Sequence, residues 1–111
     1  MAVFTARRLA GPVFLSTSAA SLYTVAAGRT GVVKQIILNN TGSAALTVTA
    51  NLVPNGASVA TSNQIISQLS IAGFSQIIWS ADLPLSPGDS VHLVANGANA
   101  VTATISGIEI V

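Results

Sequence analysis

The sequence contains no cysteine, a single histidine and only three acidic residues. Without cysteine the chain has no disulfide framework, no thiolate metal site and no thiol nucleophile. One histidine beside three carboxylates cannot easily supply the ligands of a zinc site or the members of a catalytic triad. We therefore predict no catalytic residue, no metal site and no cofactor site, and we expect that the chain is not an enzyme.

Charge is also scarce, since Asp, Glu, Lys and Arg make up 6% of the 111 residues and the formal net charge is +1. Soluble domains usually contain about 25% of these residues. A nearly neutral surface favours association over solubility, and the centres of protein interfaces are depleted in charge. The composition therefore predicts a subunit whose neighbours cover much of its surface, as in a homo-oligomer or a lattice.

Nucleic acids and membranes are disfavoured as partners. Of the four basic residues only Arg7 and Arg8 are adjacent, whereas nucleic-acid binding needs several clustered cations to neutralise phosphates. No apolar run reaches the ~20 residues of a membrane span. The apolar stretch of residues 9–15 follows the two arginines as in a signal peptide, but it is short and Gly11-Pro12 interrupts it.

What the sequence has in abundance is short β-rich runs, which from residue 21 onward alternate with Gly, Asn, Pro and Ser. Ala45–Val53 alternates apolar and polar residues with a period of two, which marks a half-buried strand. Gln64–Ser70 fits a helical turn as well as a strand. The other predicted strands are Leu22–Val25, Val32–Asn39, Phe74–Trp79, Ser90–Ala95 and Val101–Val111.

This spacing predicts an all-β fold. Seven or eight strands at intervals of roughly ten residues are typical of an antiparallel β-sandwich or a jelly roll. A chain of 111 residues forms one such domain and buries about 65% of its unfolded surface, which is enough for a two-layer core. We assign residues 21–111 to this β-sandwich domain.

Residues 1–20 differ from the rest of the chain because they lack clear alternation and contain Gly11-Pro12. We interpret them as an extended N-terminal arm with one short strand at residues 13–16. We expect that the arm binds a partner, and that deleting residues 1–15 abolishes binding while the domain still folds. The predicted partner-binding residues of the arm are Val3, Phe4, Arg7, Arg8, Leu9, Val13 and Phe14.

The remaining polar candidates are predicted to have structural roles. His92 is expected to be a half-exposed strand residue with a local hydrogen bond. Asp89 follows Pro87-Gly88, so its carboxylate is expected to bind the backbone of its own turn, and Asp82 is expected to lie in a loop.

Two interpretations stay open at this point. Trp79 and Tyr23 could form a stacking platform for a sugar, although core or interface positions are favoured because the sequence has no aromatic cluster. Arg29 and the two arginines of the arm either anchor acidic patches of a partner or are solvated.

Five segments form a pattern in their order along the chain: LYTVAAGRT from Leu22, VKQIILNN from Val33, LVPNG from Leu52, PLSPGDS from Pro84 and VTATISGIE from Val101. In this order they resemble a group of small virion proteins of tailed bacteriophages, over residues 21–110. The resemblance implies a β-sandwich that decorates or cements a phage head, or lies on the tail. It implies no catalytic residues, and the arm falls outside it.

Our first hypothesis is a capsid decoration (cement) protein. It would be a homotrimer on the outer surface of the head, with the major capsid protein or other virion proteins as partners. The chain would be made in the host cytoplasm and located in the virion, on the head rather than the tail. The alternative is a tail- or fibre-associated adhesion module that binds carbohydrate of the host surface.

Overall fold

The computed structural model describes residues 3–111, and in it the first strand pairs with the last. β1 (Phe4–Phe14) lies antiparallel to β8 (Val101–Ile110). The same relation repeats inward along the chain: β2 (Ala20–Thr24) pairs with β7 (Ser90–Ala95), β3 (Thr30–Asn40) with β6 (Gln76–Leu85), and β4 (Leu46–Val53) with β5 (Gln64–Ile71). The chain is therefore one ribbon of four antiparallel pairs, rolled into a jelly roll.

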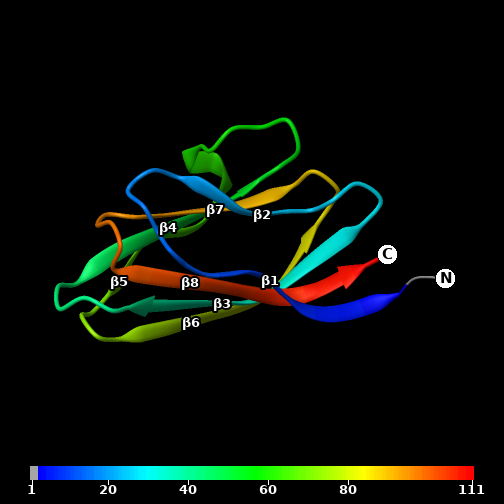
Figure 1. Cartoon of the computed structure of the whole chain (residues 1–111). Coiled ribbons are helices and arrows are strands. Elements are labelled where there is room, and N and C mark those ends of the chain that lie inside the picture. Colours follow the sequence, from blue (N-terminus) through cyan, green and yellow to red (C-terminus); the bar gives the residue numbers. More distant parts are fainter. Residues whose placement is uncertain (1–2) are drawn as a thin grey trace.

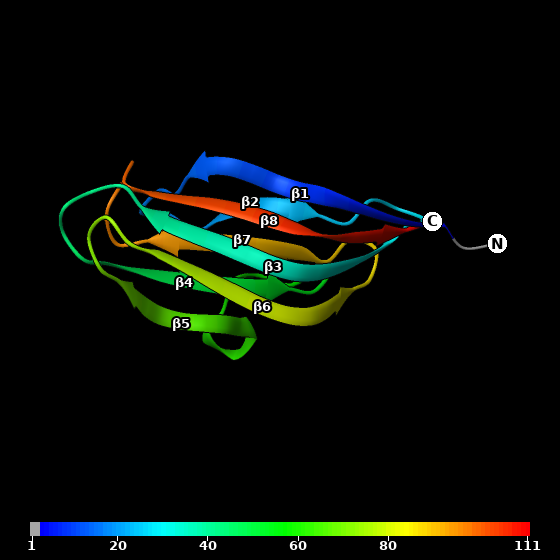
Figure 2. The same ribbon diagram turned by 90° about the horizontal axis from the view of Figure 1, so that it is seen from below.

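Successive pairs of the ribbon fall alternately into two sheets. Sheet A has the order β1-β8-β3-β6, and sheet B has the order β2-β7-β4-β5. Figure 1 shows the two layers from the side, and Figure 2 shows sheet A in front of sheet B. The predicted antiparallel β-sandwich is confirmed. The described residues contain one short 3-10 helix, η1 (Thr61–Asn63), and no helix that is long and apolar enough to cross a membrane.

The core fills the space between the sheets, because alternate residues of each strand point inward. β8 shows this most clearly: its buried residues alternate with half-exposed ones along the whole strand. The fully buried large side chains come from both sheets: Leu15, Val25, Val33, Ile36, Leu38, Val48, Ile71, Leu85, Val91, Leu93, Val101 and Ile105. The strands predicted at Ser90–Ala95 and Val101–Val111 are present as β7 and β8.

The expected arm differs from what the structure shows, because residues 4–14 form an edge strand of sheet A. β1 is hydrogen-bonded to β8 from Phe4 to Phe14, where one short strand at residues 13–16 was predicted. Its register shifts twice, between Arg8 and Ala10 and between Ala10 and Val13. These register shifts remove the alternation by which a strand is recognised.

Gly11 is required where β1 bends. Its φ is +78°, and a Cβ atom there would lie 2.2 Å from the carbonyl oxygen of Ala103 on β8. Gly107 of β8, which interrupts the alternation of that strand, stays in register with Arg7. A register shift lies on the neighbouring strand β3, between Val33 and Gln35.

β6 is longer than predicted, since it continues through Asp82 to Leu85, and the prediction of a loop at Asp82 is wrong. Pro84 indicated a turn in the sequence, but proline is tolerated on an edge strand, where its missing N–H faces away from the sheet. Asp89 does bind its turn, accepting hydrogen bonds from the backbone N–H groups of Asn55 and Ser86. That prediction is confirmed.

Candidate interaction surface

The large apolar side chains that remain exposed gather at β1. Residues 3–111 contain eight of them, four of which lie within residues 3–14, and Phe4 is the most exposed of these four at 67%. The eight are Val3, Phe4, Val13, Phe14, Val59, Phe74, Ile78 and Val111. The four form two adjacent pairs, Val3 with Phe4 and Val13 with Phe14, one at each end of the strand. Exposed apolar groups that adjoin one another mark interaction sites more often than single ones. β1 is therefore the candidate interaction surface.

The first half of β1 presents different residues to the interior and to solvent. Residues directly opposite each other in a pair share a face, and Thr5 and Arg7 lie opposite Glu109 and Gly107. Glu109 is buried, so Thr5 and Arg7 lie on the same face of sheet A as its carboxylate, although both stay exposed at the sheet edge. Phe4, Ala6 and Arg8 consequently point to the outer face of sheet A.

The second half of β1 borders a groove of about 370 Å³. Val13 and Phe14 line it from β1, and Leu22 and Leu93 line it from sheet B. Leu9 packs against the core and is only partly buried, so it is less available to a partner than the sequence analysis expected. The groove and the exposed Val13 and Phe14 form the apolar part of this surface.

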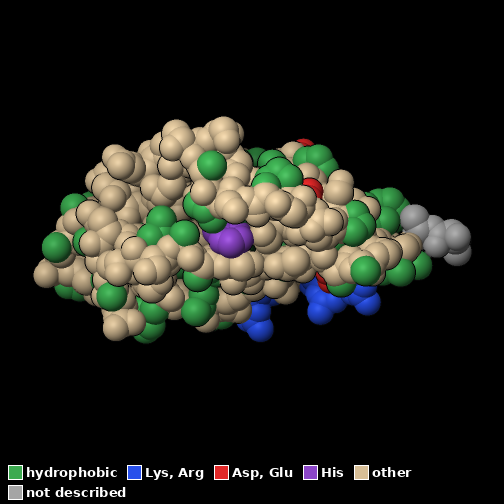
Figure 3. All heavy atoms as spheres, turned by 90° about the horizontal axis from the view of Figure 1, so that it is seen from above, with side chains coloured by type: hydrophobic (Ala, Val, Ile, Leu, Met, Phe, Trp, Pro, Cys, Tyr) green, Lys and Arg blue, Asp and Glu red, His purple; other side chains and the backbone are tan. Residues whose placement is uncertain are grey.

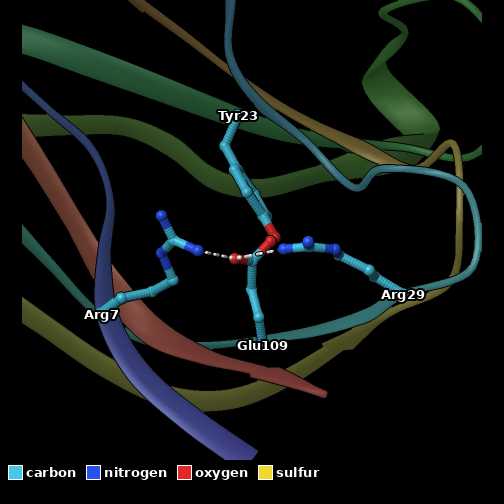
Figure 4. A network of polar contacts seen from close by, with 4 residues as sticks. All are labelled: Arg7, Tyr23, Arg29 and Glu109. Atoms are coloured by element: carbon cyan, nitrogen blue, oxygen red, sulfur yellow. Dashed lines mark hydrogen bonds and ion pairs between the residues drawn. The ribbon is translucent and has the colours of Figure 1, made fainter. Parts of the chain in front are cut away.

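A buried carboxylate holds the first half of β1 to the rest of the sandwich (Figure 4). Arg7 on β1 donates a hydrogen bond from Nη1 to Oε1 of Glu109 on β8 at 2.8 Å. Arg29, in the loop between β2 and β3, lies 3.6 Å from the same oxygen. Tyr23 on β2 donates its hydroxyl to Oε2 of Glu109 at 3.0 Å. Both sheets are therefore tied together through one acidic side chain.

This network assigns roles that the sequence analysis missed. The inward position of Glu109 could have been recognised in the sequence. Alternate residues of β8 point inward, and Glu109 falls in the same series as Val101, Ala103 and Ile105. An acidic residue at an inward position needs partners of opposite charge. Arg7 and Arg29 supply them and still expose about half of their side chains, at 52% and 41%.

The same surroundings perturb the ionisation of Tyr23. Burial of the hydroxyl raises its pKa to about 12 from the ordinary value of 10.0, and the hydrogen bond to Glu109 acts in the same direction. The positive charges of Arg7 and Arg29 oppose the rise without cancelling it. The protonated phenol is therefore the form that the folded state favours.

The raised pKa predicts a loss of stability in alkali. Below pH 10 the phenol is protonated in both states, and the folded state has its full advantage. As the pH rises from 10 to 12, the unfolded chain releases this proton first, so the free energy of unfolding should fall by about 2 kcal/mol. Urea denaturation at pH 9 and pH 12 measures the change. The variant Tyr23→Phe should not show this fall in the free energy of unfolding.

Because the chain has a single tyrosine, absorbance of the phenolate reports Tyr23 alone. The native protein should titrate near pH 12 and the urea-unfolded protein near pH 10. A native midpoint at the ordinary value would contradict the buried hydrogen bond.

His92 makes the local hydrogen bond predicted for it, with Nε2 3.0 Å from Oγ of Ser90. Its Nδ1 is buried and has no partner among the described residues. In a catalytic triad a third group binds the other ring nitrogen and orients the histidine, and residues 3–111 place no such group at His92. The described residues also include no cluster of three His, Cys, Asp or Glu that could hold a metal ion.

The two aromatic residues considered as a sugar platform do not form one. Tyr23 is buried and bound to Glu109. Trp79 lies opposite the fully buried Ile36 and packs against the core. Figure 3 shows the outer face of sheet B, where polar and backbone atoms predominate and the histidine is visible. The core positions that the sequence analysis favoured for Tyr23 and Trp79 therefore agree with the structure, and the platform does not form.

Comparisons with known proteins reveal a shared fold. No protein-family model matches the chain, and a search of curated proteins finds no relative. A chain in the structure of infectious bursal disease virus, Gx strain, aligns with 98% of this chain at 9% identity and a TM-score of 0.57. A chain in the structure of the Gt strain aligns with 98% at 8% identity and a TM-score of 0.51.

This chain spans about a third of the length of those viral chains, 32% and 31% respectively. At such low identity the similarity concerns the fold alone. It agrees with the jelly-roll topology, and it leaves the resemblance to tailed-bacteriophage virion proteins as a prediction. Because jelly rolls serve several unrelated functions, function has to be argued from the surface.

Proposed function

We propose that the chain is a structural protein of a virus particle, and within that class a capsid decoration (cement) protein on the outer surface of a phage head. The observation that carries the proposal is the exposed apolar surface of β1 on an otherwise nearly uncharged jelly roll. A β-sandwich whose edge strand β1 exposes apolar side chains suits a role in which the function is binding and not catalysis. The shared fold with chains of a virus structure supports the class.

In this proposal β1 contacts the major capsid protein or other virion proteins, and three copies associate. Phe4 and Phe14 expose 67% and 51% of their surface. Burying the exposed surface of each ring against a partner would contribute about 1–2 kcal/mol to the free energy of association. The contribution of one copy is small, but it is multiplied over all copies on a shell. The carbohydrate-binding alternative lacks its stacking platform, because its two aromatic residues point into the protein.

Location on the particle tests the proposal directly. Particles purified from cultures that produce the chain are labelled with an antibody against it and imaged by electron microscopy. We expect the label on the head surface. A label confined to the tail, or no label on any particle, would refute the decoration role.

Substitution of the exposed rings tests the surface. Phe4→Ser combined with Phe14→Ser should weaken association with particles about tenfold or more, because each tenfold step corresponds to about 1.4 kcal/mol. Co-sedimentation of the purified variant with particles that lack the chain measures this. The fold should survive, since both rings are at least half exposed.

Phe74 supplies the matched control. It is 75% exposed but lies in the turn between β5 and β6, away from β1. Phe74→Ser removes the same ring and should leave binding within twofold. If Phe74→Ser weakens binding and the β1 variant does not, the surface has been placed on the wrong part of the molecule.

The deletion first considered for this test is unsuitable. Removing residues 1–15 would remove all of β1, together with its pairing to β8 and the buried Leu15. Loss of particle binding would then not separate a lost contact from an unfolded domain. The point substitutions avoid this ambiguity.

A further inference from the structure

The free edge of β1 indicates what kind of partner segment it can bind. We propose that residues 4–8 of β1 pair, as part of a continuous sheet, with an extended acidic segment of another protein. The location of this pairing, on a virus particle, rests on the proposed function. The proposed pairing adds the conformation and the charge of the segment that is bound.

The hydrogen bonds to β8 leave every second residue of this segment open. Val3 and Val111 exchange two backbone hydrogen bonds, at 2.9 and 3.0 Å. In an antiparallel pair such exchanges recur at alternate residues, so Thr5 and Arg7 face β8 with their backbone groups. The N–H and C=O groups of Phe4, Ala6 and Arg8 therefore point away from β8. Among residues 3–111 no strand lies beyond β1 in sheet A, so this row is free to pair.

The other three sheet edges are protected, which distinguishes this one. β6 carries Pro84 and a register shift between Leu83 and Ser80. β5 shifts register twice against β4 and contains Gln68 at a φ of 47°. β2 has only five residues and a shift of its own. Bulges, prolines and short length are the usual means of blocking strand addition. Residues 4–8 show none of them and keep an unbroken register.

Charge decides which strand fits. Arg7 and Arg8 lie within the segment and Arg29 lies near it, while Glu109 is the one acidic side chain that these residues contact in the described chain. Three positive charges against one leave an excess of two. Figure 3 shows Lys and Arg side chains projecting along one long margin of the molecule. Carboxylates on an added strand would offset this excess of positive charge.

The same charges argue against a second copy of this chain as the occupant. Pairing β1 with β1 of another copy would place four arginines on two neighbouring strands and add no free carboxylate to offset them, and this like charge disfavours the pair. Phe4 projects from the outer face next to Ile110. A strand that alternates acidic with apolar residues therefore fits both the cations and the ring.

A peptide titration tests the inference without any particle. The probe is a capped nine-residue peptide that alternates Glu with Val or Thr, and its control has Lys in place of Glu. Amide hydrogen exchange is followed by NMR on the full chain. In the free protein, the amides of Thr5 and Arg7 should be protected and those of Phe4, Ala6 and Arg8 should exchange rapidly. The Glu peptide should protect these three, and the Lys peptide should not.

Two variants of Ala6 separate backbone pairing from side-chain contact. Ala6→Pro removes an N–H that makes no bond to β8, so the fold should persist while affinity for the Glu peptide falls at least tenfold. Ala6→Val adds side-chain bulk but keeps the N–H, and should bind within twofold of the natural chain. Arg8→Glu should lose the Glu peptide and gain the Lys peptide.

Several outcomes would overturn the inference. These are equal binding of both peptides, equal binding by the two Ala6 variants, and protection of Phe4, Ala6 and Arg8 by self-association without peptide. Its failure differs from that of the decoration role. Peptide binding without label on heads would refute decoration alone, whereas labelled heads without peptide binding would refute strand addition alone.

Discussion

Glu109→Ala is expected to lower the free energy of unfolding by about 3 kcal/mol at pH 7. The substitution leaves the buried hydroxyl of Tyr23 without its acceptor and leaves Arg7 and Arg29 without their counter-charge. Breaking a buried ion pair typically costs 3–5 kcal/mol, and we take the low end because both arginines can reach water. Urea denaturation followed by the fluorescence of the single tryptophan, Trp79, measures the change.

Asp82→Ala is the matched control. Asp82 also pairs with a cation, Lys34, but both side chains are largely exposed. Exposed ion pairs contribute at most about 1 kcal/mol, so this variant should stay close to the natural chain. Equal losses for Asp82→Ala and Glu109→Ala would show that the buried network does not hold β1 to the sandwich.

Asn40→Ala should destabilise the fold to a similar extent, by about 3 kcal/mol. Asn40 is fully buried at the end of β3. Its Nδ2 donates to the carbonyl oxygens of Ala44 and Ile71, and its Oδ1 accepts from the N–H of Gly42. Alanine leaves these three backbone groups unsatisfied, at a cost of about 1 kcal/mol or more each. Urea denaturation again provides the measurement.

The preceding residue provides an internal comparison. Asn39 is half-buried, and its side chain makes no hydrogen bond within residues 3–111. Asn39→Ala should change the free energy of unfolding by no more than about 0.5 kcal/mol. Asn40→Asp should be at least as harmful as Asn40→Ala at neutral pH, because a carboxylate would face two carbonyl oxygens. A harmless Asn40→Asp would contradict the assigned hydrogen bonds.

The sequence was informative wherever a strand has a complete inward face. Ser90–Ala95 was predicted with the bounds that β7 has, because Val91, Leu93 and Ala95 are all buried and alternate with less buried residues. Alternation fails at the edges of a sheet. β1 contains two register shifts, and β6 contains a proline, so each was recognised only in part.

The sequence indicated that apolar residues of β1 lie on the surface, but it did not indicate which strand β1 pairs with. Phe4, Val13 and Phe14 lie on the surface as expected, while Arg7 turns inward to Glu109. That contact joins residues at opposite ends of the chain. It depends on which strand becomes the neighbour of β8, and local sequence carries no information on that choice.

The rolled ribbon also has a kinetic consequence. During synthesis β4 and β5 can meet once residues 54–71 have been made, but β1 has to wait until residues 101–110 have left the ribosome. Closing so long a stretch of chain is slow, and an unpaired strand with exposed phenylalanines is prone to aggregate in the meantime. Recombinant expression should therefore yield more soluble material at low temperature, where nascent chains are fewer and have longer to complete the roll.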